Sequence, residues 1–140
     1  MKVLILCTGN SCRSQMAHGF LQSFDKNMQV FSAGTHPARK VNPLAVEVMA
    51  EVGIDISTHV PTDVAVYLDE TWDYVITVCG NANETCPAFV GNVGKRLHIG
   101  FDDPSEATGT PEFIKSEFSR VRNEIRNGFL TIEGGHRIGI

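Results

Sequence analysis

The sequence predicts an α/β fold in which a single four-stranded parallel sheet carries helices on both faces. Short runs of consecutive apolar residues, typical of strands buried on both sides, alternate along the chain with segments whose apolar residues recur at helical spacing. This alternation favours parallel strands joined by right-handed helical crossovers. With 140 residues, 42% of them hydrophobic, and no linker or repeat, the chain predicts one domain over residues 1–133 and a flexible tail over residues 134–140.

The first half of the chain contains two predicted strand–helix units. Residues 2–6 are an apolar run that predicts a buried strand, and residues 29–32 predict a second, shorter one. Residues 14–24 predict a helix whose apolar side chains share one face: Met16, Ala17, Phe20, Leu21 and Phe24. Residues 43–51 predict another helix, because Asn42 is a good N-cap, a proline follows it and a glycine stands just past the end.

The second half continues the pattern. Residues 74–78 and 95–99 predict two further strands, and a weaker helical segment over residues 63–68 precedes them. A proline opens the final predicted helix, residues 111–129, which carries apolar residues at helical spacing: Phe113, Ile114, Phe118, Val121, Ile125 and Phe129.

Chemically reactive residues follow three of the four predicted strands. Cys7 follows the first strand, Cys79 follows the third, and the Asp102-Asp103-Pro104 turn follows the fourth. The carboxyl ends of parallel strands share one edge of the sheet, where such folds bind their ligands. We therefore expect these residues to converge although they are far apart in the sequence.

Composition and charge exclude several classes of function. The net charge of −4 and the isoelectric point near 5.7 argue against a nucleic-acid-binding surface. The N-terminal apolar run is too short for a signal peptide, and no segment approaches membrane-spanning length. These features predict a cytoplasmic protein, a monomer on grounds of its small size, whose four cysteines are reduced at rest and which needs no cofactor.

The loop after the first strand has the composition of an oxyanion-binding site. Between Cys7 and Arg13 lie five short, mostly polar residues: Thr8, Gly9, Asn10, Ser11 and Cys12. Gly9 is free to take a positive φ angle, so successive backbone N–H groups can converge on one point. The helix that starts near Arg13 adds its N-terminal N–H groups and dipole. The Arg13 guanidinium can bind an oxyanion through two parallel hydrogen bonds.

Cys7 is the predicted nucleophile. Surroundings that bind an anion also stabilise a thiolate, which typically lowers a cysteine pKa to between ~3.5 and 7.5. Ser14 can donate a hydrogen bond to that thiolate. The alternative is a buried strand-end cysteine beside a chance arginine. The loop is not a Walker phosphate loop, because the order G-x-x-x-x-G-K-[ST] is absent.

A second pair of cysteines lies seven residues apart in the segment CGNANETC. A loop of this composition can close the distance that a disulfide between Cys79 and Cys86 requires. Cys79 could attack an adduct on Cys7, and Cys86 could then take over the bond by thiol–disulfide exchange. Two incidental loop cysteines are the alternative. A zinc site is disfavoured because no C-x₂-C pair exists, so we predict no metal.

Asp103 is the predicted general acid. The proline after it keeps its backbone extended, so its side chain can be fixed toward the loop and can protonate a leaving oxygen. Asp102 is the local competitor for this role. A solvated or helix-capping pair of aspartates is the alternative interpretation.

The chain also resembles a known family. It contains, in this order, CTGNSCRSQMA, FSAG, NPLAVEVM, VITVCGNANETCP and GFDDP. Over residues 2–129 these motifs resemble the low-molecular-weight protein tyrosine phosphatase fold in its thioredoxin-coupled arsenate reductase branch. The phosphatases share the C-x₅-R-S loop and the Asp-Pro acid, and the reductase branch adds the later cysteine pair.

The resemblance implies arsenate as substrate, with phosphate or sulfate as competing oxyanions. It implies that Cys7 attacks arsenate held by Arg13 and the loop, while Asp103 protonates the departing oxygen. A Cys7–Cys79 disulfide would form as arsenite leaves. A Cys79–Cys86 disulfide would replace it and be reduced by thioredoxin or another dithiol. Cys12 matches a loop cysteine outside this relay, with roles in packing and oxidation sensitivity.

Two departures from the family pattern bear on function. Some members bind potassium through an asparagine, a serine and two carboxylates, which match Asn10, Ser32 and Asp63 here. This chain has His18 where those members carry glutamate, so we expect no potassium site. We expect His18 to be an ordinary exposed helix residue, and a role in tuning the loop is the alternative. Ser105 stands where phosphotyrosine-directed phosphatases place an aromatic residue, which argues against a protein phosphatase.

Two other functions stay open at the level of sequence. A phosphatase would use Cys7, Arg13 and Asp103 for phosphoryl transfer through a cysteinyl-phosphate and would need no further thiols. A non-enzymatic redox sensor or oxyanion-binding module would use the later cysteine pair but leave Asp103 without a purpose.

Overall fold

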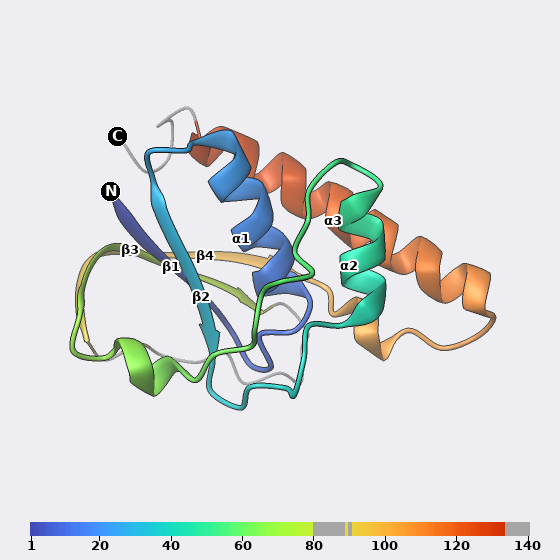
Figure 1. Ribbon diagram of the computed structural model, residues 1–140, viewed down its shortest axis with the longest axis horizontal. Helices are drawn as coiled ribbons and strands as arrows, with labels where there is room; N and C mark the ends of the chain where they lie inside the picture. Colours follow the sequence, from blue (N-terminus) through green and yellow to red (C-terminus); the bar gives the residue numbers. More distant parts are fainter. Residues whose placement is uncertain (80–88, 90, 134–140) are drawn as a thin grey trace.

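The computed structural model describes residues 1–79, 89 and 91–133, and its sheet confirms the predicted α/β fold. Four parallel strands lie in the order β2-β1-β3-β4: β1 (Lys2–Cys7), β2 (Gln29–Gly34), β3 (Thr71–Cys79) and β4 (Asn92–Phe101) (Figure 1). β1 is the central strand that leads into the candidate site. Its residues pair with β2 at Val3↔Val30 and with β3 at Ile5↔Ile76.

Among the described residues, helices pack against both faces of the sheet, but more of them pack against one face than against the other. One face packs against three α-helices: α1 (Arg13–Phe24), α2 (Pro43–Ala50) and α3 (Pro111–Glu133). Side chains such as Phe20, Val48 and Val121 form one buried cluster with β1 on this face. The other face packs against the short 3₁₀ helix η1 (Val64–Tyr67), which stands apart from the three α-helices in Figure 1, through a smaller cluster around Trp72.

The element boundaries differ from the predictions mainly at β3 and β4. Each strand begins three residues earlier than its local pattern predicts, and these first residues pair with one another at Thr71↔Asn92 and Trp72↔Val93. The partner strand supplies backbone hydrogen bonds there that a local pattern cannot reveal. The weak helical segment over residues 63–68 forms only η1, which Asp63 caps by accepting a hydrogen bond from the N–H of Ala65.

The last helix is longer than the sequence predicts. α3 continues to Glu133, four residues past its predicted end at residue 129. The predicted tail, residues 134–140, lies outside the described residues. None of the helices that the structure describes has the length and apolar character needed to cross a membrane.

Candidate active site

The loop between β1 and α1 is anchored from the outside by the segment that follows β2. The carbonyl oxygens of Thr8, Gly9 and Ser11 accept hydrogen bonds of 2.9 to 3.0 Å from backbone N–H groups of residues 36–42. In a trans peptide, the carbonyl and the N–H that follows it point in opposite directions. Since these carbonyls point outward, the N–H groups after them point to the inner side of the loop. That arrangement concentrates hydrogen-bond donors on a bound anion.

Asn10, and not Gly9, takes the left-handed conformation in this loop. Its φ angle is 51°, and Gly9 is not among the described residues with positive φ, so the loop does not use the conformational freedom of Gly9. Asparagine tolerates this conformation because its short side chain can form local hydrogen bonds. The buried Asn10 side chain donates to the Ser14 hydroxyl at 2.7 Å and accepts from the N–H of Thr62 at 2.9 Å. These bonds fix the loop shape.

Gly34, at the end of β2, has a role that its sequence pattern does not reveal. A Cβ atom at position 34 would lie 2.3 Å from the carbonyl oxygen of Thr8 and 3.1 Å from the backbone nitrogen of Asn10. Only glycine therefore lets β2 approach this closely to the loop of residues 8–12, which we call the oxyanion loop. The one available signal was a glycine that directly follows an apolar strand, which many turns share.

We expect the substitution Gly34→Ala to lower the free energy of unfolding by about 2 kcal/mol or more, because the methyl group must displace backbone. Urea unfolding measures this change, and protection of Cys7 from alkylation by sulfate reports the accompanying loss of oxyanion binding. Gly9→Ala is the matched control for stability, because its Cβ would make only ordinary contact at 3.6 Å from the Ser11 hydroxyl. Equal stability losses in both variants would contradict the steric explanation.

Arg13 joins the start of α1 to the end of β4. Its side chain is 4% exposed, its Nη1 donates to the carbonyl oxygen of Phe101 at 3.2 Å, and its Nη2 lies 3.5 Å from Oδ2 of Asp103. The guanidinium thus has a fixed position between the oxyanion loop and the turn after β4. A planar group held in this way is prepared to bind an oxyanion through two hydrogen bonds.

The structure separates the roles of the two adjacent aspartates. Asp102 is exposed and pairs with Arg120 of α3 at 3.2 Å, whereas the Asp103 side chain is 20% exposed and faces Arg13. Asp103 also caps the short 3₁₀ helix η2 (Pro104–Glu106). Of the two carboxylates, the one predicted as general acid lies beside the oxyanion loop.

Three of the four cysteines lie in one buried cluster at the carboxyl edge of the sheet. Cys7 ends β1 and is 3% exposed, and Cys79 ends the neighbouring strand β3 and is 2% exposed. Cys79 pairs with Phe101 in the β3–β4 ladder. Phe101 ends β4 just before the Asp103 turn, so Cys79 lies on the strand next to that turn. Cys7 carries a thiol, whereas Cys79 is disulfide-bonded, so the structure differs from the prediction that all four cysteines are reduced at rest. Cys86, the fourth predicted site cysteine, lies outside the described residues.

Cys12 is also buried in this cluster, but it is chemically unlike a nucleophile. Burial raises its pKa to about 12, against a weak opposing contact from the Ser11 hydroxyl at 3.9 Å. It is therefore a neutral thiol at physiological pH. Since oxidation follows thiolate character and exposure, the structure favours packing over the expected oxidation sensitivity.

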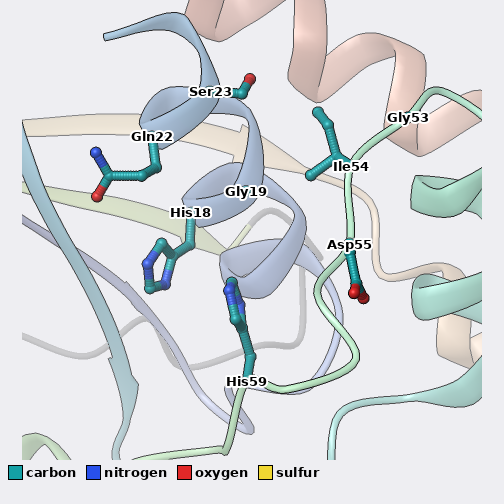
Figure 2. Close-up of a pocket in the computed structure, with 8 residues that line it drawn as sticks. All are labelled: His18, Gly19, Gln22, Ser23, Gly53, Ile54, Asp55 and His59. Carbon is teal, nitrogen blue, oxygen red and sulfur yellow. The ribbon is translucent and has the colours of Figure 1, made fainter. Parts of the chain in front are cut away.

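A hydrogen-bonded network behind the loop continues from Asn10 to two histidines. The buried Gln15 donates from Nε2 to both the backbone and side-chain oxygens of Asn10 at 3.1 Å. Its remaining oxygen must accept, so the Nδ1 of His59 donates to it at 2.9 Å. The His59 ring lies against the His18 ring (Figure 2), and their centroids are 4.6 Å apart.

His18 is not the exposed helix residue that its sequence context suggests. It is partly buried, and its Nδ1 lies 2.9 Å from the hydroxyl of Ser32 in β2. Burial, together with the neighbouring His59, lowers the pKa of His18 to about 4. Burial also lowers the pKa of His59, and Asp55 opposes that shift. Both rings are therefore uncharged at neutral pH.

The two histidines border a cavity of about 300 Å³ behind the oxyanion loop. The other residues that line it are Gly19, Gln22, Ser23, Gly53, Ile54 and Asp55 (Figure 2). None of residues 7–14 lines it, so this cavity is separate from the oxyanion loop. Within residues 1–79, 89 and 91–133, no group of three or more His, Cys, Asp or Glu side chains is arranged to hold a metal ion.

We expect the free energy of unfolding to fall as the pH drops from about 6.5 to about 4, because His18 binds a proton more readily in the unfolded chain. The pKa is 6.5 unfolded and about 4 folded, so this contribution is complete above pH 6.5 and lost on acidification toward pH 4. The loss amounts to roughly 3 kcal/mol. Urea unfolding at pH 7.5 and 4.5 measures it. His18→Phe keeps a ring without a titrating group, and a pH dependence as steep as in the wild type would contradict the assignment.

Comparison with known proteins identifies the relatives of this chain. The family model described as low molecular weight phosphotyrosine protein phosphatase matches residues 2–129. An arsenate reductase of Shouchella clausii is 48% identical over 124 residues, which cover 88% of each chain. An arsenate reductase of Bacillus subtilis is 46% identical over 126 residues, which cover 89% of each chain.

Solved structures show the same similarity in three dimensions. An arsenate reductase in the phosphate binding state superposes with a TM-score of 0.78 at 30% identity, over 95% of this chain and 96% of that chain. An arsenate reductase in the oxidized state superposes with a TM-score of 0.74 at 28% identity, over 96% of this chain and 98% of that chain. The similarity thus extends over nearly the whole length of each protein.

Proposed function

This chain belongs to the low molecular weight phosphotyrosine protein phosphatase family, and from that premise we propose that it is an arsenate reductase, an enzyme that converts arsenate to arsenite. One observation carries the choice of reaction within the family. A second buried cysteine, Cys79, ends the strand next to the one that delivers Cys7. Phosphoryl transfer through a cysteinyl-phosphate has no use for this second sulfur, whereas two-electron reduction requires it.

The oxyanion loop and Arg13 bind the arsenate. The inward backbone N–H groups of Gly9, Asn10 and Cys12 donate to its oxygens, and the Arg13 guanidinium adds two parallel hydrogen bonds. Because the Ser14 hydroxyl accepts from Asn10, its own hydrogen can be donated to a second acceptor, for which we propose the Cys7 thiolate. Phosphate and sulfate have the same tetrahedral shape and compete for the site.

The reaction then proceeds through three nucleophilic attacks, each by a cysteine thiolate. The Cys7 thiolate attacks arsenic(V), and one arsenate oxygen leaves as water with a proton from Asp103. The reduced Cys79 thiolate attacks the Cys7 sulfur, so an S–S bond forms and the electron pair of the S–As bond stays on arsenic. Arsenic is thereby reduced to arsenic(III) and departs as arsenite. Cys86 next attacks Cys79, which releases Cys7 and leaves a Cys79–Cys86 disulfide.

An external dithiol must supply the two electrons that restore the Cys79–Cys86 pair. We propose thioredoxin as this reductant, because a dithiol protein reduces a disulfide by the same exchange chemistry. Such a cycle suits the reducing cytoplasm, which is the location we propose. We propose that the enzyme acts as a monomer, because every residue in the scheme comes from one chain.

The two other functions explain fewer of the observed contacts. A phosphatase accounts for Cys7, Arg13 and Asp103 but not for the buried Cys79. A redox sensor accounts for Cys79 but gives no role to Asp103, which faces the buried Arg13. Arsenate reduction uses all of these residues in one reaction.

Arsenite production by the purified protein tests the proposal. We expect arsenite to form when arsenate, thioredoxin, thioredoxin reductase and NADPH are present, and not when thioredoxin is omitted. At pH 6, we expect iodoacetamide to alkylate Cys7 first and arsenate or phosphate to protect it. Equal labelling of all reduced cysteines would remove the basis for an activated nucleophile. Failure to form any arsenite with the complete reducing system would refute the function.

A further inference from the structure

Ser105, in the turn after β4, makes two hydrogen bonds to a single oxygen of Asp103. Its hydroxyl donates to Asp103 Oδ1 at 2.6 Å, and its backbone N–H donates to the same oxygen at 3.0 Å. The other carboxylate oxygen, Oδ2, faces Arg13 Nη2 at 3.5 Å. The carboxylate therefore presents two chemically different oxygens, one bound within the turn and one directed at the oxyanion loop.

From this geometry we propose that Ser105 is a positioning residue that makes Oδ2 of Asp103 the proton-donating oxygen of the reaction. The proposal rests on the proposed function, because it concerns the protonation of the departing arsenate oxygen. A carboxyl group that carries its proton on Oδ2 still accepts both Ser105 hydrogen bonds on Oδ1. The arrangement is thus compatible with Asp103 before and after it gives up its proton.

The hydroxyl contact does more than cap η2. A backbone N–H alone is sufficient for an Asp cap at the start of a short helix, and Ser105 supplies that N–H whatever its side chain. The hydroxyl adds a second bond at 2.6 Å, the length typical of an O–H donor to an ionised carboxylate. Two donors that reach one oxygen from different directions restrict rotation of the carboxylate about its side-chain torsions. Without the hydroxyl, the protonated carboxyl group can turn its O–H away from the oxyanion loop.

The proposal is specific to the side chain at position 105, and the surrounding turn is held by other contacts. Pro104 is buried, and Asp102 is tied to α3 through Arg120. Removing the Ser105 hydroxyl should therefore change the orientation of the Asp103 carboxylate while the turn stays in place. A loss of activity in such a variant would therefore come from the altered orientation of the Asp103 carboxylate and not from unfolding of the turn.

A double-mutant cycle tests the proposal through the rate of a single turnover of arsenate to arsenite. We expect Ser105→Ala to lower this rate about 10-fold in the wild-type background. In an Asp103→Asn background, where no carboxylic acid remains to be oriented, Ser105→Ala should have no further effect. Ser105→Thr keeps a hydroxyl and should restore most of the rate. Sulfate protection of Cys7 should be unchanged in Ser105→Ala, because the oxyanion loop is intact.

Ser116→Ala is the matched control, because Ser116 also donates a 2.6 Å hydrogen bond to a local acceptor, the carbonyl of Phe113 on α3. It should leave the single-turnover rate at the wild-type value. An unchanged rate in Ser105→Ala, or the same loss in the Asp103→Asn background, would overturn the proposal. A crystal structure of Ser105→Ala gives a readout that does not depend on arsenate reduction. Asp103 turned away from Arg13 supports the proposal, and an unmoved Asp103 carboxylate refutes it.

Discussion

Replacing Cys86 with serine is expected to stop arsenate reduction after one arsenite per protein molecule when thioredoxin is the sole reductant. The first two thiolate attacks need only Cys7 and Cys79, so one equivalent of arsenite should still form. Serine cannot resolve the resulting Cys7–Cys79 disulfide, because an alcohol is not a nucleophile for thiol–disulfide exchange. The steady-state rate should therefore fall more than about 100-fold, since both steps after arsenite release are blocked. Arsenite is measured per mole of protein in the burst and at steady state.

Two further variants locate the block within the relay. Cys79→Ser should release no arsenite at all, because no thiolate remains to attack the Cys7 adduct. Cys12→Ala should continue past one equivalent whatever its rate, because the Cys12 thiol, with a pKa of about 12, takes no part in the exchange. Mass spectrometry of the trapped Cys86→Ser protein should identify a Cys7–Cys79 disulfide. Normal multiple turnover of Cys86→Ser with thioredoxin alone would show that the relay is wrong.

The placement of the site was predictable because it follows from topology. Once the strands before Cys7, Cys79 and Asp103 are recognised as parallel, their carboxyl ends must share one sheet edge. The observed order β2-β1-β3-β4 puts these three ends on adjacent strands. Local apolar patterns were sufficient for this step, even though they missed the first residues of β3 and β4.

The contacts that shape the site were not predictable from local sequence. Asn10, rather than Gly9, takes the left-handed conformation because Ser14, Gln15 and Thr62 bind its side chain, and Thr62 is far along the chain. Gly34 matters because another backbone segment lies against it. Such requirements come from tertiary packing, which no periodic pattern records.

The electrostatic environments of His18 and of the two adjacent aspartates were also not predictable from local sequence. The sequence places His18 on a helix but does not reveal that Ser32 and His59 surround it, so neither its burial nor its lowered pKa could be anticipated. Sequence favours Asp103 over Asp102 only through the proline that follows it. They differ in the structure because Arg120 faces one and Arg13 faces the other.

Replacing Arg13 with lysine should separate the contribution of guanidinium geometry from that of positive charge. Lysine keeps the charge but has a compact ammonium group that cannot make two parallel hydrogen bonds to an oxyanion. It also lacks the planar guanidinium that contacts both the Phe101 carbonyl and the Asp103 carboxylate in the wild type. We expect kcat/KM for arsenate to fall at least about 100-fold, the typical cost of one lost oxyanion donor. Sulfate should also protect Cys7 from alkylation less well.

Arg122→Lys is the matched control for this experiment. The Arg122 side chain is 11% exposed and also contacts one backbone carbonyl, that of Val48, and one carboxylate, that of Glu51, but it lies between α3 and α2. Both variants should lose stability to urea, because each gives up a largely buried guanidinium contact. Only Arg13→Lys should lose oxyanion protection and arsenate reduction. If the two variants reduced arsenate equally well, Arg13 would be a structural link between α1 and β4, and the anion would have to be held by the loop N–H groups alone.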